Sequence, residues 1–208
     1  MCREKEIIIF VKAPVPGNVK TRLVPPLGYN QAAELYRAWA REALVNVKRL
    51  EDTRVEVAYA AHPEIPSPDW LSDDKNSPDY FMQSGGNLGE KLTHAFVRAF
   101  SAGMRRVVII GSDSPGLPAG YLMNAFGALE RADVVIGPSD DGGYYLIGLR
   151  NCLQPDLFRD IPWSSPKVLG RTMDAVSRVG LTVELLPEYF DIDTFDDLEK
   201  YQAKFGRE

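Results

Sequence analysis

The sequence has few of the side chains that form disulfides or hold zinc. Its 208 residues include two cysteines and two histidines. Cys2 lies at the extreme N-terminus and far from Cys152, so a structural disulfide is not expected, and neither thiol has a histidine at zinc-site spacing. His62 and His94 stand in unrelated contexts. The sequence therefore favours neither a disulfide scaffold nor a zinc enzyme, and no Ser-His-Asp or Cys-His nucleophile set is visible.

The sequence also lacks an excess of positive charge. The net charge is -5 and the pI is near 5.2, and the Lys and Arg residues are scattered. This argues against a nucleic-acid surface, which needs clustered cations. No apolar run approaches the length of a membrane span, and no charged segment precedes a signal-type run. A soluble cytoplasmic protein without nucleic-acid or membrane partners is expected.

Short apolar runs rich in β-branched residues alternate with segments of helical periodicity. The runs predict buried strands at 6–12, 55–61, 80–83, 107–110, 133–137, 144–149 and 181–186. Helices are expected at about 31–50, 88–104, 118–131, 166–179 and from 195 onward. Asn30 is the expected N-cap of the first helix, and a serine followed by Pro166 is expected to begin the fourth. The pattern predicts an α/β fold, and we expect one domain over 1–208.

The run at 107–110 ends in Gly111-Ser112-Asp113. Ligands of open α/β sheets bind beyond the carboxyl ends of the strands. Asp113 is therefore expected to point into a site, where it would hold a divalent metal against the phosphates of a nucleotide.

A cationic loop at 12–23 follows the first predicted strand. If the strands are parallel, this loop shares a rim with Asp113, and Lys20 or Arg22 would neutralise phosphates. A solvated surface loop is the alternative. The segment 17–21 (GNVKT) resembles part of a P-loop, but Val19 stands where that motif requires glycine. This disfavours a P-loop kinase.

Three further segments offer site residues. The glycine-rich segment 83–92 opens a helix, which is either a flexible turn or a nucleotide contact. Asp140 and Asp141 lie in a turn and could contact a substrate hydroxyl. Asp191-Ile192-Asp193 superficially resembles a phosphatase D-x-D nucleophile, but that motif belongs after a first strand. Asp193 or Thr194 could cap the last helix, or Asp193 could supply a second carboxylate to the metal.

Together these segments resemble the glycosyltransferase-A-type nucleotide-diphospho-sugar transferases. The similarity is strongest to a small stand-alone group known as a domain of unknown function. It is carried by FVKAPVPGNVKTRL, QSGGNLGEKL, GSDSPGLP, GPSDDGGYYLIGL, WSSP and DIDTFDDL, spread over nearly the whole chain. The resemblance implies a Rossmann-like, three-layer α/β/α fold with a mostly parallel mixed sheet. Its nucleotide-binding half would span about 1–115 and its acceptor-binding half about 116–208.

The resemblance also implies roles for individual residues. The expected catalytic residues are Asp113, Lys20, Arg22 and Asp141. Mg²⁺ or Mn²⁺ is expected on Asp113 and Asp193, because Ser112-Asp113-Ser114 carries one acid where the family's D-x-D motif has two. The nucleotide is expected against Ala13, Pro14, Gly17, Lys20, Arg22, Gln83, Gly85, Gly86, Gly89 and Ser112. The acceptor is expected against Asp140, Asp141, Gly142, Gly143, Tyr144 and Trp163.

Three functions fit these residues. A metal-dependent glycosyltransferase would move a sugar from a sugar nucleotide to a small acceptor and release a nucleoside diphosphate. A nucleotidyltransferase would join an NTP to a phosphorylated acceptor and release pyrophosphate. A nucleotide-binding module would bind its ligand without turnover. The first is the expected function because of the resemblance, and the binding module is the least favoured, since the acids and the basic loop gather on one rim. The sequence makes no prediction of oligomeric state.

Overall fold

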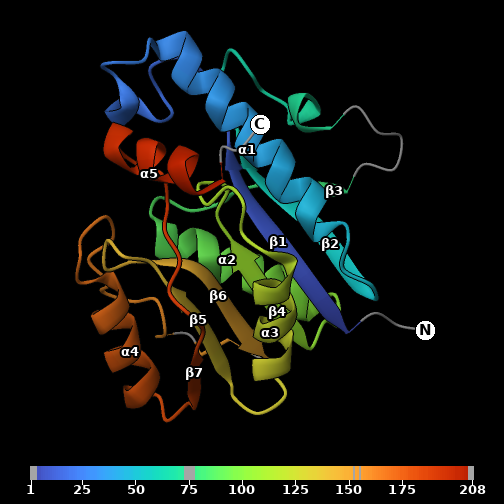
Figure 1. The fold of residues 1–208 in the computed structure, drawn as a ribbon. Coiled ribbons are helices and arrows are strands. Elements are labelled where there is room, and N and C mark those ends of the chain that lie inside the picture. The colour runs from blue at the N-terminus through green and yellow to red at the C-terminus, as the bar shows by residue number, and fades with distance from the viewer. Residues whose placement is uncertain (1–3, 73–77, 152, 155, 206–208) are drawn as a thin grey trace.

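A single twisted sheet forms the centre of the molecule (Figure 1). The computed structural model describes residues 4–72, 78–151, 153–154 and 156–205, so Cys2 and Cys152 lie outside the described residues. The sheet has seven strands in the order β3-β2-β1-β4-β6-β5-β7. β6 runs antiparallel to β4 and β5, whereas the other neighbouring strands are parallel. This confirms the predicted Rossmann-like α/β fold with a mostly parallel mixed sheet.

The elements follow the predicted alternation. The strands are β1 (Lys5–Lys12), β2 (Thr53–Ala60), β3 (Asp79–Met82), β4 (Arg106–Ile110), β5 (Val134–Pro138), β6 (Tyr144–Arg150) and β7 (Val183–Leu185). The α-helices are α1 (Tyr29–Val47), α2 (Leu88–Ser101), α3 (Ala119–Ala128), α4 (Val168–Arg178) and α5 (Phe195–Phe205). Two short 3₁₀ helices are η1 (Thr21–Leu23) and η2 (Asp69–Leu71).

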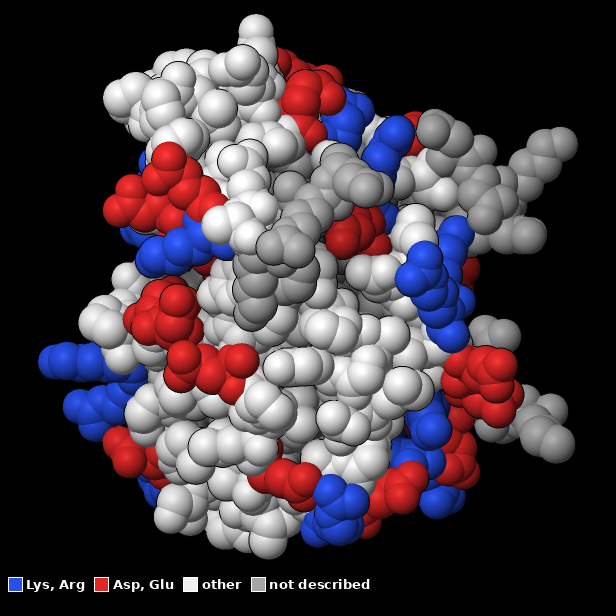
Figure 2. Space-filling model, viewed as in Figure 1, with Lys and Arg blue, Asp and Glu red and all other residues white. Residues whose placement is uncertain are grey.

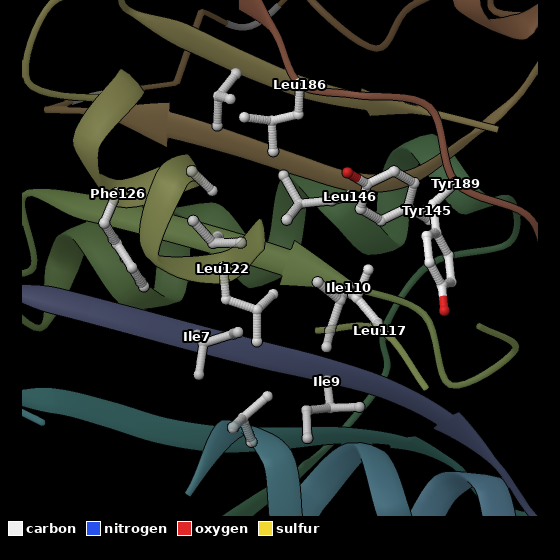
Figure 3. Close-up of a cluster of buried hydrophobic side chains, with 14 of the residues drawn as sticks. Ile7, Ile9, Ile110, Leu117, Leu122, Phe126, Tyr145, Leu146, Leu186 and Tyr189 are labelled. Atoms are coloured by element: carbon white, nitrogen blue, oxygen red, sulfur yellow. The ribbon is translucent and has the colours of Figure 1, made fainter. Parts of the chain in front are cut away.

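Both faces of the sheet are covered, because successive side chains of a strand point to opposite faces. Ile7 and Ile9 of β1 pack with side chains of α1 and α3 on one face. Figure 3 shows this cluster, with Leu122 of α3 set between strand side chains. Ile8 of β1 packs on the other face, where α2 and α4 supply the covering residues. The result is the predicted three-layer arrangement.

The C-terminal segment crosses back to the first loop of the chain. α5 lies near the beginning of α1 (Figure 1), and Ile192 and Leu198 share a buried cluster with Leu23 and Trp39. The backbone N–H of Ile192 donates to the carbonyl of Asp113 at 3.1 Å. This packing places the residues that precede α5 directly beside the end of β4.

Two helix starts differ from the sequence predictions, and a third decides between the two predicted capping residues. The N-cap of α1 is Gly28 rather than Asn30, and the Gln31 side chain accepts the Gly28 N–H at 2.8 Å. α4 begins at Val168 after Lys167, later than predicted. The Ser165 hydroxyl donates to the Pro162 carbonyl and accepts the Lys167 N–H at 3.3 Å, within the turn that precedes the helix. Before α5, the Thr194 hydroxyl accepts the backbone N–H of Asp197 at 3.3 Å. Thr194 is therefore the capping residue, and the Asp193 carboxylate is available for other contacts.

Charge on the molecule is mixed in sign. On the face shown in Figure 2, acidic and basic side chains lie interspersed and form no large patch of one sign. That face therefore carries no concentrated positive charge of the kind that binds a nucleic-acid backbone. Among the residues that the structure describes, no helix is long and apolar enough to cross a membrane.

Candidate functional site

A cleft opens at the edge of the sheet where β1 and β4 end. These two strands are parallel neighbours, so the loop after Lys12 and the segment after Ile110 lie on the same rim. The cleft has a volume of about 630 Å³ and extends from the first loop to the segment before α4. A second hollow of about 340 Å³ shares Lys12, Asp113 and Tyr144 with it and continues toward Gln83 at the end of β3. The two hollows form the candidate site.

An ion-pair cluster lies at the centre of the cleft. The Lys20 Nζ is 2.9 Å from Asp113 Oδ1 and 3.0 Å from Asp193 Oδ1. The Lys20 side chain is 5% exposed, whereas those of Asp113 and Asp193 are 36% and 44% exposed. Arg22 approaches the other Asp193 oxygen at 3.6 Å and is itself 74% exposed. The ammonium is thus enclosed, and the carboxylates that hold it face the cleft.

The local backbone turns Lys20 inward. Lys20 has φ 48° and ψ 37°, a left-handed conformation that costs an L-residue other than glycine about 1–2 kcal/mol. Its ammonium lies 5.8 Å from the centre of the Trp39 ring. Burial acts to lower the pKa of Lys20, but Asp113 and Asp193 outweigh burial and hold the pKa above its ordinary value. Lys20 is therefore a fixed positive charge at neutral pH.

Asp191 adds a third carboxyl group to this cluster and lines both hollows. The Ser114 hydroxyl donates a hydrogen bond to it. Burial raises the pKa of Asp191 to about 6, against the effect of the Ser114 bond, and the charge of Asp113 adds to the rise. The sequence around Asp191 predicts no site role for this residue, and its position beside Ser114 comes from the tertiary fold.

Tyr36 joins the two strand ends beneath the cleft. Its hydroxyl forms a 2.8 Å hydrogen bond with the Ser112 hydroxyl and accepts the backbone N–H of Lys12 at 2.7 Å. Tyr36 belongs to α1, and its buried side chain borders both hollows. Tyr36 therefore fixes the distance between the first loop and the segment that carries Asp113.

The opposite wall of the cleft comes from the turn between β5 and β6 and from the segment before α4. The Oδ1 atom of Asp141 accepts the Ser139 hydroxyl at 2.6 Å and the Gly143 N–H at 2.8 Å. Tyr144 and Trp163 meet edge to face, with ring centres 6.4 Å apart. This wall presents a positioned carboxylate beside two aromatic rings.

Many of the expected site residues line the two hollows. They are Lys20, Arg22, Gln83, Ser112, Asp113, Asp141, Gly143, Tyr144, Trp163 and Asp193. The remaining expected residues line neither hollow: Ala13, Pro14, Gly17, Gly85, Gly86, Gly89, Asp140 and Gly142.

The glycine-rich loop has structural contacts of its own. The Glu90 side chain accepts the Gly86 N–H at 2.6 Å. A Cβ on Gly89 would lie 2.8 Å from the Phe158 carbonyl and 3.0 Å from the Trp163 ring. A Cβ on Gly142 would lie 2.4 Å from the Pro166 carbonyl. Gly89 and Gly142 therefore allow the segment before α4 to approach the site closely.

Several lining residues were not among the predicted site residues. They include Lys12, Tyr36, Ser139, Ser164 and Asp191. Tyr36 belongs to a periodic aromatic stripe that predicts only core packing, and its ring is indeed buried. Lys12 could have been suspected as the last residue of a strand that ends at the ligand rim.

The carboxylates of the cleft suit a hard divalent cation. Asp113 and Asp193 already converge on one positively charged nitrogen, and Mg²⁺ commonly uses one or two carboxylates completed by phosphates and water. Within the described part of the chain, no three His, Cys, Asp or Glu side chains are arranged to hold a metal ion. Most ligands of such an ion would therefore come from substrate and solvent.

Comparisons with known proteins agree with this architecture. The crystal structure of a Desulfovibrio desulfuricans G20 protein, provisionally named a nucleotide-diphospho-sugar transferase, is 37% identical with a TM-score of 0.90, covering 98% of this chain and 89% of that chain. The 4-diphosphocytidyl-2C-methyl-D-erythritol synthase of Anaerococcus prevotii is 13% identical with a TM-score of 0.65, covering 98% and 97%.

A third structure is more distant. The Mycobacterium tuberculosis protein Rv0371C in complex with manganese is 12% identical with a TM-score of 0.52, covering 94% of this chain and 97% of that chain. The two structures of low identity share the fold. No curated protein sequence matches the chain.

The family model described as "Uncharacterized protein conserved in bacteria (DUF2064)" matches residues 43–165. This match spans more than half of the chain and includes the end of β4, the turn before β6 and Trp163. The chain therefore belongs to the DUF2064 family, within the nucleotide-diphospho-sugar transferase fold.

Proposed function

We propose that the protein transfers a glycosyl group from a nucleotide-diphospho-sugar to a neutral hydroxyl of a small acceptor, with Mg²⁺ or Mn²⁺ as cofactor. The proposed nucleotide-binding half is about 1–115 and the acceptor-binding half about 116–208. The supporting observation is the uneven distribution of charge across the cleft.

Positive charge lies on the donor side. Lys12, Lys20 and Arg22 line the larger hollow, and Lys91 lines the smaller one. These side chains would bind the diphosphate of the donor, because charge-assisted hydrogen bonds to phosphate are strong. Asp113 and Asp193 would hold the cation, which would stabilise the negative charge that develops on the diphosphate leaving group.

The acceptor wall has the opposite character. Its described lining residues include Asp141, Tyr144, Trp163 and several serines, but neither Lys nor Arg. A phosphorylated acceptor would meet a carboxylate there with no cation to offset its charge. A hydroxyl group, in contrast, can donate a hydrogen bond to Asp141. This asymmetry favours glycosyl transfer to a neutral acceptor over nucleotidyl transfer to a phosphorylated one.

In the proposed reaction the acceptor oxygen attacks the anomeric carbon of the donor sugar. A new carbon–oxygen bond forms as the bond between that carbon and the diphosphate oxygen breaks. The acceptor proton passes to Asp141, whose Oδ1 is held by Ser139 and Gly143. Lys20 and Arg22 neutralise the departing nucleoside diphosphate. The residues act by positioning and electrostatics, without a covalent enzyme intermediate.

Nucleotidyl transfer is the second candidate. It is supported by the shared fold with a cytidyltransferase-type synthase, although at low identity. Product analysis separates the candidates: the enzyme is incubated with sugar nucleotides or with NTPs and sugar phosphates, and the released nucleoside diphosphate or pyrophosphate is measured. We expect nucleoside diphosphate. Pyrophosphate release would overturn the proposal, and metal-independent ligand binding without turnover would indicate a binding module.

A pair of neighbouring acids tests the base. Asp141 lines the cleft, whereas the adjacent Asp140, which is also exposed, does not. We expect Asp141→Asn to lower kcat by about 10²–10⁴-fold with little change in donor affinity, the range for loss of a general base. Asp140→Asn should retain nearly full activity. Equal effects of both variants would contradict the role of Asp141.

A further inference from the structure

We propose that Lys20 blocks the cation site of the nucleotide-free enzyme. When the donor binds, the Lys20 side chain would move so that its ammonium pairs with the donor diphosphate, and the cation site would open. This inference rests on the proposed metal role of Asp113 and Asp193. It adds a function for Lys20 beyond phosphate binding: the lysine makes metal binding depend on the phosphate ligand.

The first step is competition for the same atoms. Lys20 Nζ contacts Asp113 Oδ1 at 2.9 Å and Asp193 Oδ1 at 3.0 Å. A divalent cation that bridges these carboxylates would compete with the ammonium for Asp113 Oδ1 and Asp193 Oδ1. It would also place two positive centres side by side in an enclosed site, where repulsion is weakly screened. The ammonium and the metal are therefore expected to exclude each other.

The second step is the stability of the closed arrangement. The Lys20 side chain is 5% exposed and lies against the Trp39 ring, while Arg22, two residues later, is 74% exposed. The backbone of Lys20 is left-handed, with φ 48° and ψ 37°. Arg22 keeps only a 3.6 Å approach to Asp193, whereas Lys20 bridges the two acids. A metal ion in solution must displace this enclosed charge.

The third step is release by phosphate. The cleft is lined by Lys12, Lys20 and Arg22 on one side, and a diphosphate bound there offers acceptor oxygens to the ammonium. Movement of Lys20 toward these oxygens would free the two Asp oxygens for the metal, and the phosphate would supply further metal ligands. Metal and diphosphate would then bind with positive cooperativity, each raising the affinity for the other.

The test measures binding without donor, acceptor or turnover. Mn²⁺ is titrated into the nucleotide-free wild-type protein and into Lys20→Gln, Lys167→Gln and the Lys20→Gln/Asp113→Asn double variant, with bound Mn²⁺ followed by electron paramagnetic resonance. We expect Lys20→Gln to bind Mn²⁺ about tenfold or more tightly than wild type, within the usual range of coupling between two sites. Lys167→Gln removes an exposed lysine that lines neither hollow, and it should behave as wild type. The double variant should lose the gain.

A second measurement needs only the wild-type protein and covers the case that Lys20→Gln does not fold. Unfolding temperature is recorded with Mn²⁺, with pyrophosphate and with both. We expect the shift with both ligands to exceed the sum of the separate shifts, since ligand binding stabilises by mass action.

Two results would overturn the inference. One is a folded Lys20→Gln protein that binds Mn²⁺ no more tightly than wild type, and the other is additive shifts in the wild-type protein. A separate result would contradict the proposed metal role of Asp113: unchanged Mn²⁺ binding by Asp113→Asn in the presence of pyrophosphate.

Discussion

A buried carboxyl group far from the cleft should make stability depend on pH. Glu6, near the start of β1, is 0% exposed. It lies beside Glu56 of β2, and its Oε1 is 3.6 Å from Arg54. Burial, followed by the negative charge of Glu56, raises the pKa of Glu6 from 4.5 to about 7, although Arg54 opposes the rise. The folded protein therefore keeps this proton to a higher pH than the unfolded chain.

The direction of the effect follows from proton binding in the two states. Below pH 4.5 Glu6 is protonated in both, and its contribution to stability is fully present. As the pH rises to about 7, the unfolded chain binds fewer protons than the folded protein, so the free energy of unfolding falls. One pKa unit corresponds to about 1.36 kcal/mol, so the full shift corresponds to a loss on the order of 3 kcal/mol by pH 8.

Glu6→Gln isolates this contribution. Glutamine resembles the protonated acid, so the variant should match wild type near pH 4.5 and exceed it by about 1–3 kcal/mol at pH 8. The lower end allows for the lost attraction to Arg54. Urea unfolding of both proteins across this range gives the difference, in which other titrating groups such as Asp191 cancel. Glu4→Gln, whose side chain is 50% exposed, is the control and should change stability little.

The reasoning fails if Glu6→Gln is no more stable than wild type at pH 8. It also fails if the difference between the two proteins does not grow with pH. Either result would mean that Arg54 and Arg98, which both contact Glu56, stabilise the ionised form of Glu6 as well as water does.

Two further predictions concern the site. Gly89→Ala should destabilise the protein by about 1–3 kcal/mol and shift Trp163 fluorescence, because the added Cβ would crowd Phe158 and Trp163. Gly127→Ala in α3 is the control. A Cβ there meets nothing within 4 Å, so this variant should be more stable by up to about 1 kcal/mol. Asp113→Asn should abolish metal-dependent nucleotide binding measured by calorimetry, while costing only about 1–2 kcal/mol of stability because Asp113 is partly exposed and Asp193 still pairs with Lys20. Retained metal-dependent affinity in that variant would contradict the assignment of Asp113.

The central strands were predictable because burial on both faces of a sheet demands continuous apolar runs. The apolar run at 107–110 is an example, because it lies within β4. Its end predicted that Asp113 lies just beyond the carboxyl end of a strand. The order of strands was not predictable in the same way. β6 inserts antiparallel between β4 and β5, and the local pattern of Tyr144–Arg150 does not specify its neighbours.

Helix starts were harder to predict because several residues compete to cap them. Ser165 and Pro166 have the composition of a helix start, yet the Ser165 hydroxyl bonds to the preceding Pro162 carbonyl and α4 begins at Val168. Tyr36 and Trp39 lie at helical spacing within the predicted helix at about 31–50, and both are buried. The Tyr36 hydroxyl bonds to Ser112 and the Trp39 ring lies beside the Lys20 ammonium. These contacts were not predictable, because they depend on elements that are distant in sequence.

The contact between Lys20 and Asp193 shows why the cleft depends on the complete fold. The two residues are 173 positions apart, and Asp193 reaches Lys20 only because Ile192 and Leu198 bury against Leu23 and Trp39. The Ile192 N–H also holds the Asp113 carbonyl, so one segment fixes both carboxylates. The segment before α5 thus brings a second carboxylate, Asp193, beside the single acid of Ser112-Asp113-Ser114. The charged cluster therefore forms when α5 docks against the rest of the fold.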